Sequence, residues 1–249
     1  MTCSTPLAGK HALICGGSRG IGAAITKRLA ADGAVVALTY SASPREAAAV
    51  VAEIEAAGGS AFALKADSGD VGALQAAVEA AVRRLGGIDI LVNNAGVMVR
   101  GLLDDISVAE FDRAMNINVR GMFFAAQAAV RHMPFGGRII NIGSNTAVKS
   151  NFPGSSVYTL SKTAVAGMTR ALAHDLGPRG ITINNVQPGP TVTDMNPADG
   201  PHAAQLRTMN AVKRMGTVEE VASLVAYLAG ADSAYMTGAS LTVDGGMST

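Results

Sequence analysis

The most constraining feature of this 249-residue chain is a regular alternation of short apolar runs with longer helical patterns. Parallel strands need a crossover segment between them, and such an alternation is typical of parallel sheets. Apolar runs of strand length predict strands at 11–16, 34–40, 60–67, 88–96, 137–144, 180–189 and 239–246. Helical periodicity predicts helices at 16–33, 43–59, 72–87, 107–133, 156–176 and 218–230, with an interruption near Asn116 and Asn118.

Right-handed crossovers would wind these strands into a doubly wound, Rossmann-type α/β fold. We expect a parallel sheet of about seven strands with helices on both faces. No Pro- or Ser-rich linker and no fixed-period repeat divides the chain, which predicts a single domain over residues 1–249. Residues 190–217 depart from the alternation and follow the end of a strand, where ligands bind in such sheets. We interpret them as a mobile substrate lid with short helices, the alternative being a surface insertion without function.

Composition excludes several classes of partner. The chain is 49% hydrophobic and 16% charged, with a net charge of +1, which favours neither nucleic acid nor an anionic membrane surface. No apolar run reaches membrane-spanning length, and the N-terminus lacks the layout of a signal peptide, so we expect a cytoplasmic protein. The four histidines and the two cysteines, Cys3 and Cys15, lack metal-ligand spacing, so no metal site is expected.

The first strand-to-helix turn is expected to hold a phosphate. Gly16, Gly20 and Gly22 follow the spacing G-x-x-x-G-x-G rather than the commoner G-x-G-x-x-G. Glycines let the backbone pass close to a pyrophosphate, which then lies at the positive N-terminal end of the helix. A glycine-rich turn alone can be a tight connection only, but its place between the first strand and the first helix favours a dinucleotide site.

The end of the second strand bears on which dinucleotide is bound. An Asp or Glu at this point would bind the ribose 2′-hydroxyl of NAD. The chain instead has Tyr40, Ser41, Ala42 and Ser43, with no acid among them. Hydroxyl groups and the nearby Arg19 would accept a 2′-phosphate, so NADP(H) is favoured over NAD(H). Arg19 as an exposed residue at a helix start is the alternative.

A tyrosine and a lysine stand four residues apart at the start of an apolar helix. Tyr158 and Lys162 would share one helix face, and Ser144 precedes them at a strand end. A cation beside a phenol favours the phenolate and lowers the phenol pKa from about 10, which suits proton transfer. The same spacing occurs in ordinary amphipathic helices, so this pair alone is weak evidence of catalysis.

Taken together, these motifs resemble the short, single-domain branch of the short-chain dehydrogenases/reductases, especially bacterial 3-oxoacyl-carrier-protein reductases. The resemblance covers essentially the whole chain. It rests on GGSRGIG at 16–22, Asp67, NNAG at 93–96, Asn118, Ser144, Tyr158 with Lys162, and PGPTVTD at 188–194. Two positions depart from the family pattern. Cys15 replaces a usual Thr whose hydroxyl braces the turn, and Ser68 replaces a usual aliphatic residue.

The resemblance implies catalytic roles for four residues. Tyr158 would be the general acid/base that protonates a carbonyl oxygen as hydride arrives from the nicotinamide. Lys162 would hold the nicotinamide ribose and lower the pKa of Tyr158. Ser144 would hydrogen-bond the substrate oxygen, and Asn118 would hold a water that links Lys162 to solvent.

The resemblance also implies contacts to the cofactor. Asp67 would meet the adenine amino group, Asn94 to Gly96 would line the adenosine ribose, and Thr191 and Thr193 would contact the carboxamide. The complete expected cofactor site comprises Gly16, Ser18, Arg19, Gly20, Ile21, Gly22, Tyr40, Ser41, Ser43, Asp67, Ser68, Asn94, Ala95, Gly96, Tyr158, Lys162, Pro188, Gly189, Thr191 and Thr193.

The activity implied is NADP(H)-dependent interconversion of a carbonyl and a secondary alcohol, as in a 3-oxoacyl-carrier-protein reductase. The chain also resembles bacterial cyclic-di-GMP-binding oxidoreductases, so a cyclic-di-GMP-binding or sensing protein on the same fold is the alternative. The family commonly forms tetramers with two-fold interfaces, which implies a homotetramer here. The substrate stays open, because it depends on lid residues and on Asn145, Thr146, Phe152 and Met195, which the sequence does not place.

Overall fold

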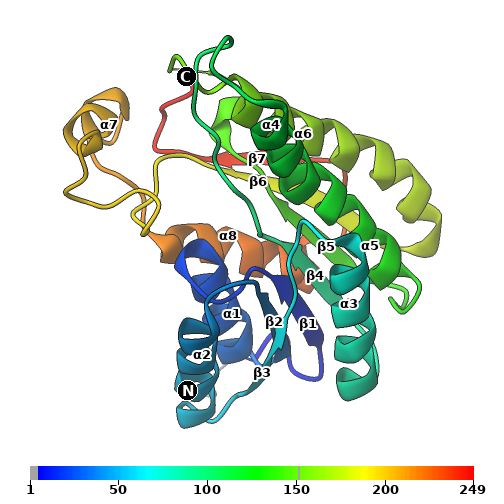
Figure 1. Ribbon diagram of the computed structural model, residues 1–249. Helices are drawn as coiled ribbons and strands as arrows, with labels where there is room; N and C mark the ends of the chain where they lie inside the picture. The colour runs from blue at the N-terminus through cyan, green and yellow to red at the C-terminus, as the bar shows by residue number, and fades with distance from the viewer. Residues whose placement is uncertain (1–4, 151) are drawn as a thin grey trace.

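A seven-stranded, fully parallel sheet forms the centre of the molecule in a computed structural model that describes residues 5–150 and 152–249. The strands run in the spatial order β3-β2-β1-β4-β5-β6-β7 (Figure 1), so the winding reverses between β1 and β4. Their bounds are β1 His11–Cys15, β2 Val35–Tyr40, β3 Ser60–Lys65, β4 Ile90–Asn93, β5 Arg138–Ile142, β6 Thr182–Pro188 and β7 Ser240–Val243. All seven lie within the expected ranges, which confirms the predicted fold class.

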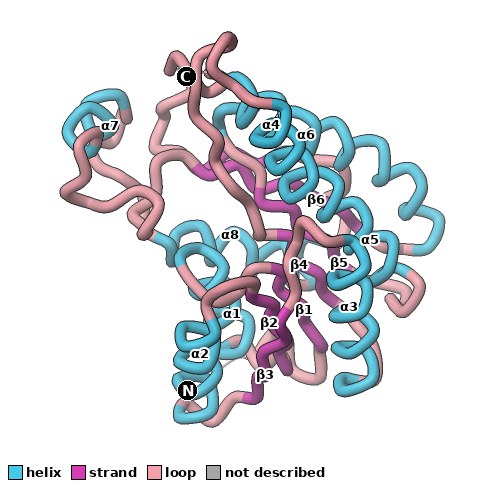
Figure 2. The backbone as a smooth tube through the Cα atoms, in the orientation of Figure 1, coloured by secondary structure: helices cyan, strands magenta, loops and turns pink. Residues whose placement is uncertain are grey.

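Helices cover both faces of the sheet (Figure 2). One layer contains α1 Gly20–Ala31, α2 Pro44–Ala56 and α8 Val218–Ala229, and the other contains α3 Val71–Leu85, α4 Val108–Met115, α5 Met122–Val130 and α6 Ser156–Leu176. Successive strand residues pack against the two helix layers in turn, because strand side chains alternate between the faces of the sheet. Ile14 packs with the α1 layer, and its neighbour Leu13 packs with the α3 layer. Short 3-10 turns occur at Asn145–Ala147, Gly177–Arg179 and Ala231–Ser233.

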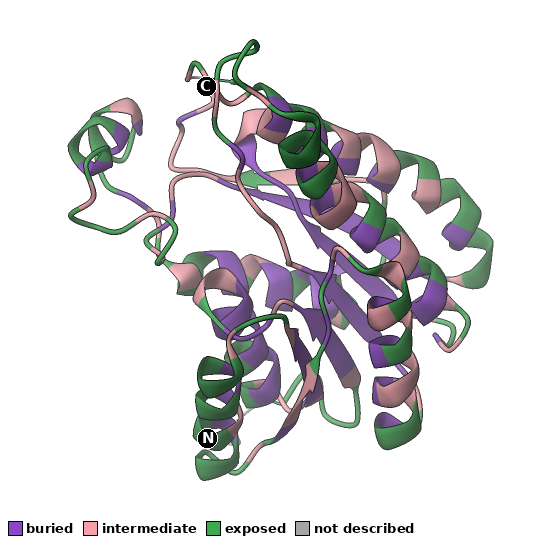
Figure 3. Ribbon diagram, viewed as in Figure 1, coloured by how far each residue is buried: buried purple, intermediate pink, exposed green. Residues whose placement is uncertain are grey.

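The central strands are buried on both faces (Figure 3). All five residues of β5 and all seven of β6 are buried, including polar ones. The buried side chains of Asn141, Asn184 and Asn185 donate hydrogen bonds to Thr169, to the carbonyl oxygen of Met236 and to Ser240. Within the described residues, no helix is both long and apolar enough to cross a membrane.

The expected interruption of the 107–133 helix is a π-helical turn. Helix α4 ends at Met115, residues Asn116–Gly121 form the π turn, and α5 begins at Met122. π turns of this kind often mark functional sites. The turn carries the fully buried Asn118 inward, toward the ends of the central strands.

Residues 190–217 form an excursion beyond the carboxyl end of β6. It contains one short helix, α7 Ala203–Met209, which lies away from the sheet in Figure 1. A β-bridge between Thr191 and Gly216 joins the two ends of the excursion. A small apolar cluster that includes Leu206 and Met247 ties the excursion to the C-terminal segment. The expected short helix is therefore present, and closure over a substrate stays a prediction.

Candidate active site

One large cleft of about 780 Å³ opens at the carboxyl ends of the strands. This is where ligands bind in doubly wound sheets, beside the point at which the strand order reverses. Every residue of the expected cofactor site lines the cleft, and so does Ser144. Asn118 is the exception, because it lies beneath the cleft wall rather than on it. Motifs spread over nearly 180 residues of sequence thus converge on one cavity.

The glycine turn leaves no room for side chains where backbone segments meet. Gly16 has a φ of +77°, a left-handed conformation that favours glycine. A Cβ atom on Gly22 would lie 2.1 Å from the carbonyl oxygen of Gly16. The same oxygen accepts a hydrogen bond of 2.7 Å from Nδ2 of Asn94. The cradle is therefore held by close backbone packing and by the asparagine of the NNAG motif.

The brace that Cys15 was expected to remove comes from the neighbouring strand. The backbone N–H of Gly16 donates to the Thr39 hydroxyl at 3.0 Å. Cys15 is buried, and burial raises the pKa of its thiol to about 12, with a hydrogen bond to Thr39 acting in the opposite direction. A thiol with so high a pKa stays protonated and unreactive at neutral pH. The departure from the family pattern is compensated by Thr39.

Hydroxyl groups meet at the expected 2′-phosphate site. The side chains of Ser18 and Ser43 lie 2.7 Å apart, Oγ to Oγ. Ser43 occupies the N-cap position of α2, but its side chain makes no capping bond because it is engaged with Ser18. Arg19 is exposed at the start of α1. Within the described residues, the acidic side chains that line the cleft are Asp67 and Asp194, which follow β3 and β6 rather than β2. Asp67 instead accepts from the backbone N–H of Gly69 at 2.9 Å, beyond the end of β3.

Ser144, Tyr158 and Lys162 converge at the other end of the cleft. Ser144 follows β5, and its hydroxyl accepts from the backbone N–H of Thr146 at 3.2 Å. Tyr158 and Lys162 lie on the first turns of α6. The Lys162 ammonium donates to the carbonyl oxygen of Ile142 at 2.8 Å and lies 5.7 Å from the centre of the Tyr158 ring. The shared helix face predicted from their spacing is confirmed.

The pKa of Tyr158 differs from the expectation. Burial raises the pKa of its phenol, and a hydrogen bond with Ser144 and the charge of Arg100 act against that rise. The net direction predicted for the Tyr158 pKa was wrong, because burial of the phenol outweighs the effects that lower its pKa. Burial lowers the pKa of the Lys162 ammonium to about 8. At neutral pH the phenol therefore keeps its proton, as a proton donor must.

The side chain of Asn118 is fully occupied by structural bonds. Its Oδ1 accepts from the backbone N–H of Val97 at 2.8 Å, and its Nδ2 donates to the carbonyl oxygen of Val97 and to the Ser161 hydroxyl. Both amide protons are used, so the side chain fixes the loop after β4 and the base of α6.

Several residues of the cleft wall were not predicted from the sequence. Arg100, Arg113, Leu206 and Met247 all line the cleft, with the expected pocket residues Asn145, Thr146, Phe152 and Met195. Arg100 lies four residues beyond the NNAG motif, and this short distance in sequence was the one indication that it could line the cleft. No such indication exists in the sequence for Leu206 and Met247, because their positions depend on how the 190–217 excursion packs on the C-terminal segment.

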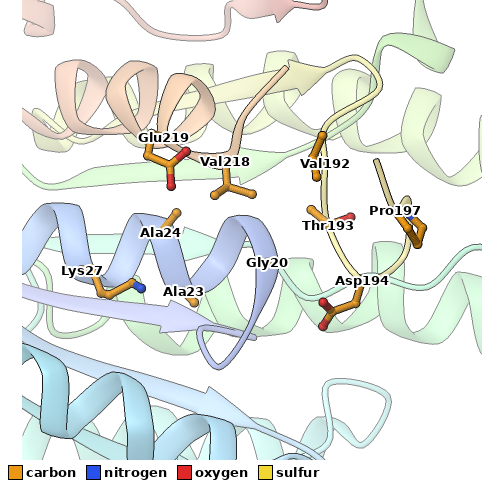
Figure 4. A pocket seen from close by; sticks show the side chains of 10 residues that line it. All are labelled: Gly20, Ala23, Ala24, Lys27, Val192, Thr193, Asp194, Pro197, Val218 and Glu219. Atoms are coloured by element: carbon orange, nitrogen blue, oxygen red, sulfur yellow. The ribbon is translucent and has the colours of Figure 1, made fainter. Parts of the chain in front are cut away.

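A smaller hollow of about 520 Å³ lies behind the excursion, between α1 and the start of α8 (Figure 4). Thr193 and Asp194 line both cavities, so this part of the excursion separates them. Figure 4 shows these residues across from Ala23 and Ala24 of α1. No catalytic candidate lines the hollow, and no cluster of metal-ligating side chains occurs in residues 5–150 and 152–249.

Known proteins are similar to this chain over almost its whole length. A family model described as enoyl-(acyl carrier protein) reductase matches residues 16–248. A curated relative from Escherichia coli, the cyclic-di-GMP-binding biofilm dispersal mediator protein, is 46% identical over 237 residues, covering 95% of this chain and 96% of the relative.

Solved structures are similar over the same length. A short-chain dehydrogenase/reductase from Serratia marcescens is 54% identical with a TM-score of 0.97, covering 98% of this chain and all of the other. A short-chain dehydrogenase from Burkholderia cenocepacia, solved in complex with NADP, is 52% identical with a TM-score of 0.96 and the same coverage.

Proposed function

The chain belongs to the short-chain dehydrogenase/reductase family and is an NAD(P)-dependent oxidoreductase, and from this premise we propose that it interconverts a carbonyl and a secondary alcohol. Its cofactor is NADP(H), in agreement with the acid-free end of β2 and with the NADP complex of its Burkholderia cenocepacia neighbour. The observation that carries the proposal is the convergence of Ser144, Tyr158 and Lys162 in the cleft that also contains the glycine cradle.

When bound, the reduced nicotinamide supplies a hydride to the carbonyl carbon. Tyr158 gives the phenolic proton to the carbonyl oxygen and is left as a phenolate, so reduction consumes one proton. Ser144 donates a hydrogen bond to the same oxygen while negative charge develops there. Its hydroxyl accepts from Thr146 and is hydrogen-bonded to the Tyr158 phenol, so its hydrogen bond passes from the phenol to the substrate oxygen when the substrate binds. These three roles rest on the geometry of the cleft and on the family resemblance.

Lys162 orients the nicotinamide ribose and stabilises the Tyr158 phenolate after proton transfer. Its buried ammonium uses one proton on Ile142, which leaves two for the ribose and for a water. Both side-chain N–H groups of Asn118 are already donated to Val97 and Ser161. A water that returns protons to Lys162 would therefore bind a main-chain group of the π turn, and Asn118 would hold that turn in place. This assigns Asn118 a role in building the proton path rather than in contacting the substrate.

The direct test follows NADPH oxidation with ketones, acetoacetyl thioesters and an enoyl thioester, in the parent and in Tyr158→Phe. We expect carbonyl reduction by the parent and a loss of about 100-fold or more in kcat for the variant, since general acids contribute 10²–10⁴. NADPH affinity should stay within a few-fold, which shows that the variant is folded. Reduction of the enoyl thioester alone, or an unimpaired variant, would overturn the proposal.

A second function, binding of cyclic-di-GMP, is favoured by one specific observation. The curated relative named for this property is 46% identical across almost the whole chain. Arg19, Arg100 and Arg113 in the cleft could pair with phosphodiester groups. Calorimetric titration with cyclic-di-GMP, with and without NADPH, tests this directly. Binding that NADPH competes away would place the dinucleotide in the cleft, and no heat at micromolar concentrations would exclude this function.

We also propose a homotetramer with two-fold interfaces. Apolar side chains stand exposed along α4 and α5: Val108 is 78% exposed, and Phe111 and Phe123 are each 38% exposed. Isologous contacts are the common way in which soluble oligomers cover such faces. Light scattering should give four times the chain mass, and Phe123→Asp should reduce it. A monomer at micromolar concentration would contradict this proposal.

A further inference from the structure

The charged side chains of the cleft divide into two groups. Arg19 and Asp67 lie at the cofactor end, on the turns that follow β1 and β3, and Lys162 lies beneath the reacting centre. Arg100, Arg113 and Asp194 remain, and they line the cleft without belonging to the expected NADP(H) site. Neither arginine forms an ion pair within the described part of the chain. Two unpaired guanidinium groups therefore face a cleft that already holds the catalytic groups.

Core packing places these arginines beside the catalytic tyrosine. Val99, Ala114 and Val157 are buried together in one apolar cluster, contributed by the loop after β4, by α4 and by α6. Arg100, Arg113 and Tyr158 are their immediate neighbours in sequence, and all three line the cleft. This shared cluster beneath the wall fixes, relative to one another, the segments that carry both arginines and the phenol.

Arg100 is close enough to act on the reacting centre. Its charge lowers the pKa of the Tyr158 phenol, against the larger effect of burial. Its Nε donates to the sulfur of Met98 at 3.0 Å, which directs the guanidinium and leaves its terminal N–H groups free. Free terminal N–H groups form the planar fork that binds a carboxylate through two parallel hydrogen bonds. Asp194 is the one acid in this group, and it lies on the excursion, between the cleft and the smaller hollow.

We propose that Arg100, assisted by Arg113, binds a carboxylate of the substrate, so that the preferred carbonyl compounds are oxo acids. This inference rests on the proposed carbonyl reduction and names its substrate class. Arg100 is a specificity-determining residue that holds the carboxylate while the carbonyl oxygen lies between Ser144 and Tyr158. A neutral ester of the same acid fits the same space but gains no charge-assisted hydrogen bond.

The test compares a series of 2-, 3- and 4-oxo acids with their methyl esters, as kcat/KM for NADPH-dependent reduction. We expect the parent to prefer the acid for at least one chain length. Arg100→Gln should lower the acid-to-ester ratio about 10-fold, because the charge-assisted hydrogen bonds to the carboxylate are lost while solvent exposure limits their strength. Arg113→Gln should lower it by less, and Arg100→Lys should keep part of the preference because it keeps the charge.

Two controls make the result specific. Arg131→Gln removes an exposed arginine that does not line the cleft, and it should leave the acid-to-ester ratio unchanged. NADPH affinity measured for each variant shows that the cofactor site is intact. Raising the salt concentration should weaken the acid preference of the parent and leave ester reduction unaffected.

The outcomes separate this inference from the proposed function. If the parent reduces esters and neutral ketones but shows no preference for any acid, the carboxylate site is wrong and the carbonyl reduction stands. An Arg100→Gln variant with the parent's acid-to-ester ratio would also overturn the site. If no carbonyl compound of any charge is reduced, the proposed function itself fails, and the inference fails with it.

Discussion

The two ends of the cleft are built in different ways. At the cofactor end, backbone meets backbone: Gly22 lies so close to Gly16 that a methyl group would be 2.1 Å from a carbonyl oxygen. At the substrate end, the wall consists of side chains from distant segments, such as Phe152, Met195 and Met247, and Met195 is 59% exposed. Close backbone contacts fix the conformation of the cofactor end. The substrate end is held by a small apolar cluster.

This contrast separates cofactor binding from substrate recognition in physical terms. A pyrophosphate and a ribose are the same in every reaction, so a rigid cradle can bind them through backbone groups. A substrate is recognised by shape and charge, which side chains on a loosely packed excursion can change without disturbing the sheet. Substitutions at the two ends should therefore have very different consequences.

Gly22→Ala should produce the largest effect. Its added Cβ would meet the Gly16 carbonyl and, at 2.4 Å, Nδ2 of Asn94, so the cradle must open. We expect NADPH affinity to fall about 100-fold or more, as for a severe overpacking change, with a lower melting temperature. NADPH fluorescence titration measures the affinity. Gly177→Ala is the matched control, because nothing lies within 4 Å of its Cβ and its backbone is helical; equal losses in both variants would contradict the close-packed cradle.

Arg19→Ala should have the next largest effect, confined to cofactor choice. Removing the guanidinium beside Ser18 and Ser43 should lower the NADPH-to-NADH ratio of kcat/KM about 10-fold or more, because a charged contact to the 2′-phosphate is lost. Exposed Arg83 of α3 lies outside the cleft, and Arg83→Ala should leave this ratio unchanged. An unchanged ratio in Arg19→Ala would place the 2′-phosphate site elsewhere.

The pH dependence of reduction should report on Lys162, where the two ends meet. Burial lowers its pKa to about 8, so the charged form is present below that pH and is lost as pH rises through it. We expect kcat/KM for reduction to be level up to about pH 7 and to fall about 10-fold by pH 9.

Lys162→Arg provides the control for that profile. Arginine stays charged over the whole pH range. Lys162→Arg, although slower than the parent, should therefore show no fall in kcat/KM above pH 8. The raised pKa of Tyr158 keeps the phenol protonated in the same window. The same fall in parent and variant would assign it to another group.

Met195→Ala should have the smallest effect, limited to the substrate. We expect KM for a bulky ketone to change about threefold, with NADPH affinity unchanged, because a partly exposed side chain loses little buried area. Val148→Ala, at a similarly exposed position outside the cleft, should change neither quantity. A fall in NADPH affinity as large as the change in KM would show that the two ends are not independent.

The same contrast explains how far the sequence could predict the molecule. Apolar runs and glycine spacing are local signals, so the strands and helices, the cradle and the Tyr158–Lys162 face followed from residues near one another. The place of Met247 and Leu206 depends on how remote segments pack, and nothing local encodes it.

Two side chains show where local rules gave the wrong detail. Ser43 stands at the N-cap of α2, but its hydroxyl bonds Ser18 instead of the helix end. The spacing of Tyr158 and Lys162 predicted their neighbourhood correctly, while burial decided the direction of the Tyr158 pKa. Capping and charge pairing are local preferences, and both give way where tertiary structure supplies a stronger partner or removes water.

The most direct test of the proposed function follows the hydride itself. NADPH carrying deuterium at the transferable position of nicotinamide C4 is incubated with the protein and a ketone or oxo acid that it reduces, and the product is examined by mass spectrometry. We predict one deuterium on the carbinol carbon of the parent's product, and loss of product in Tyr158→Phe. NADPH oxidation that yields no labelled alcohol would contradict hydride transfer to a carbonyl.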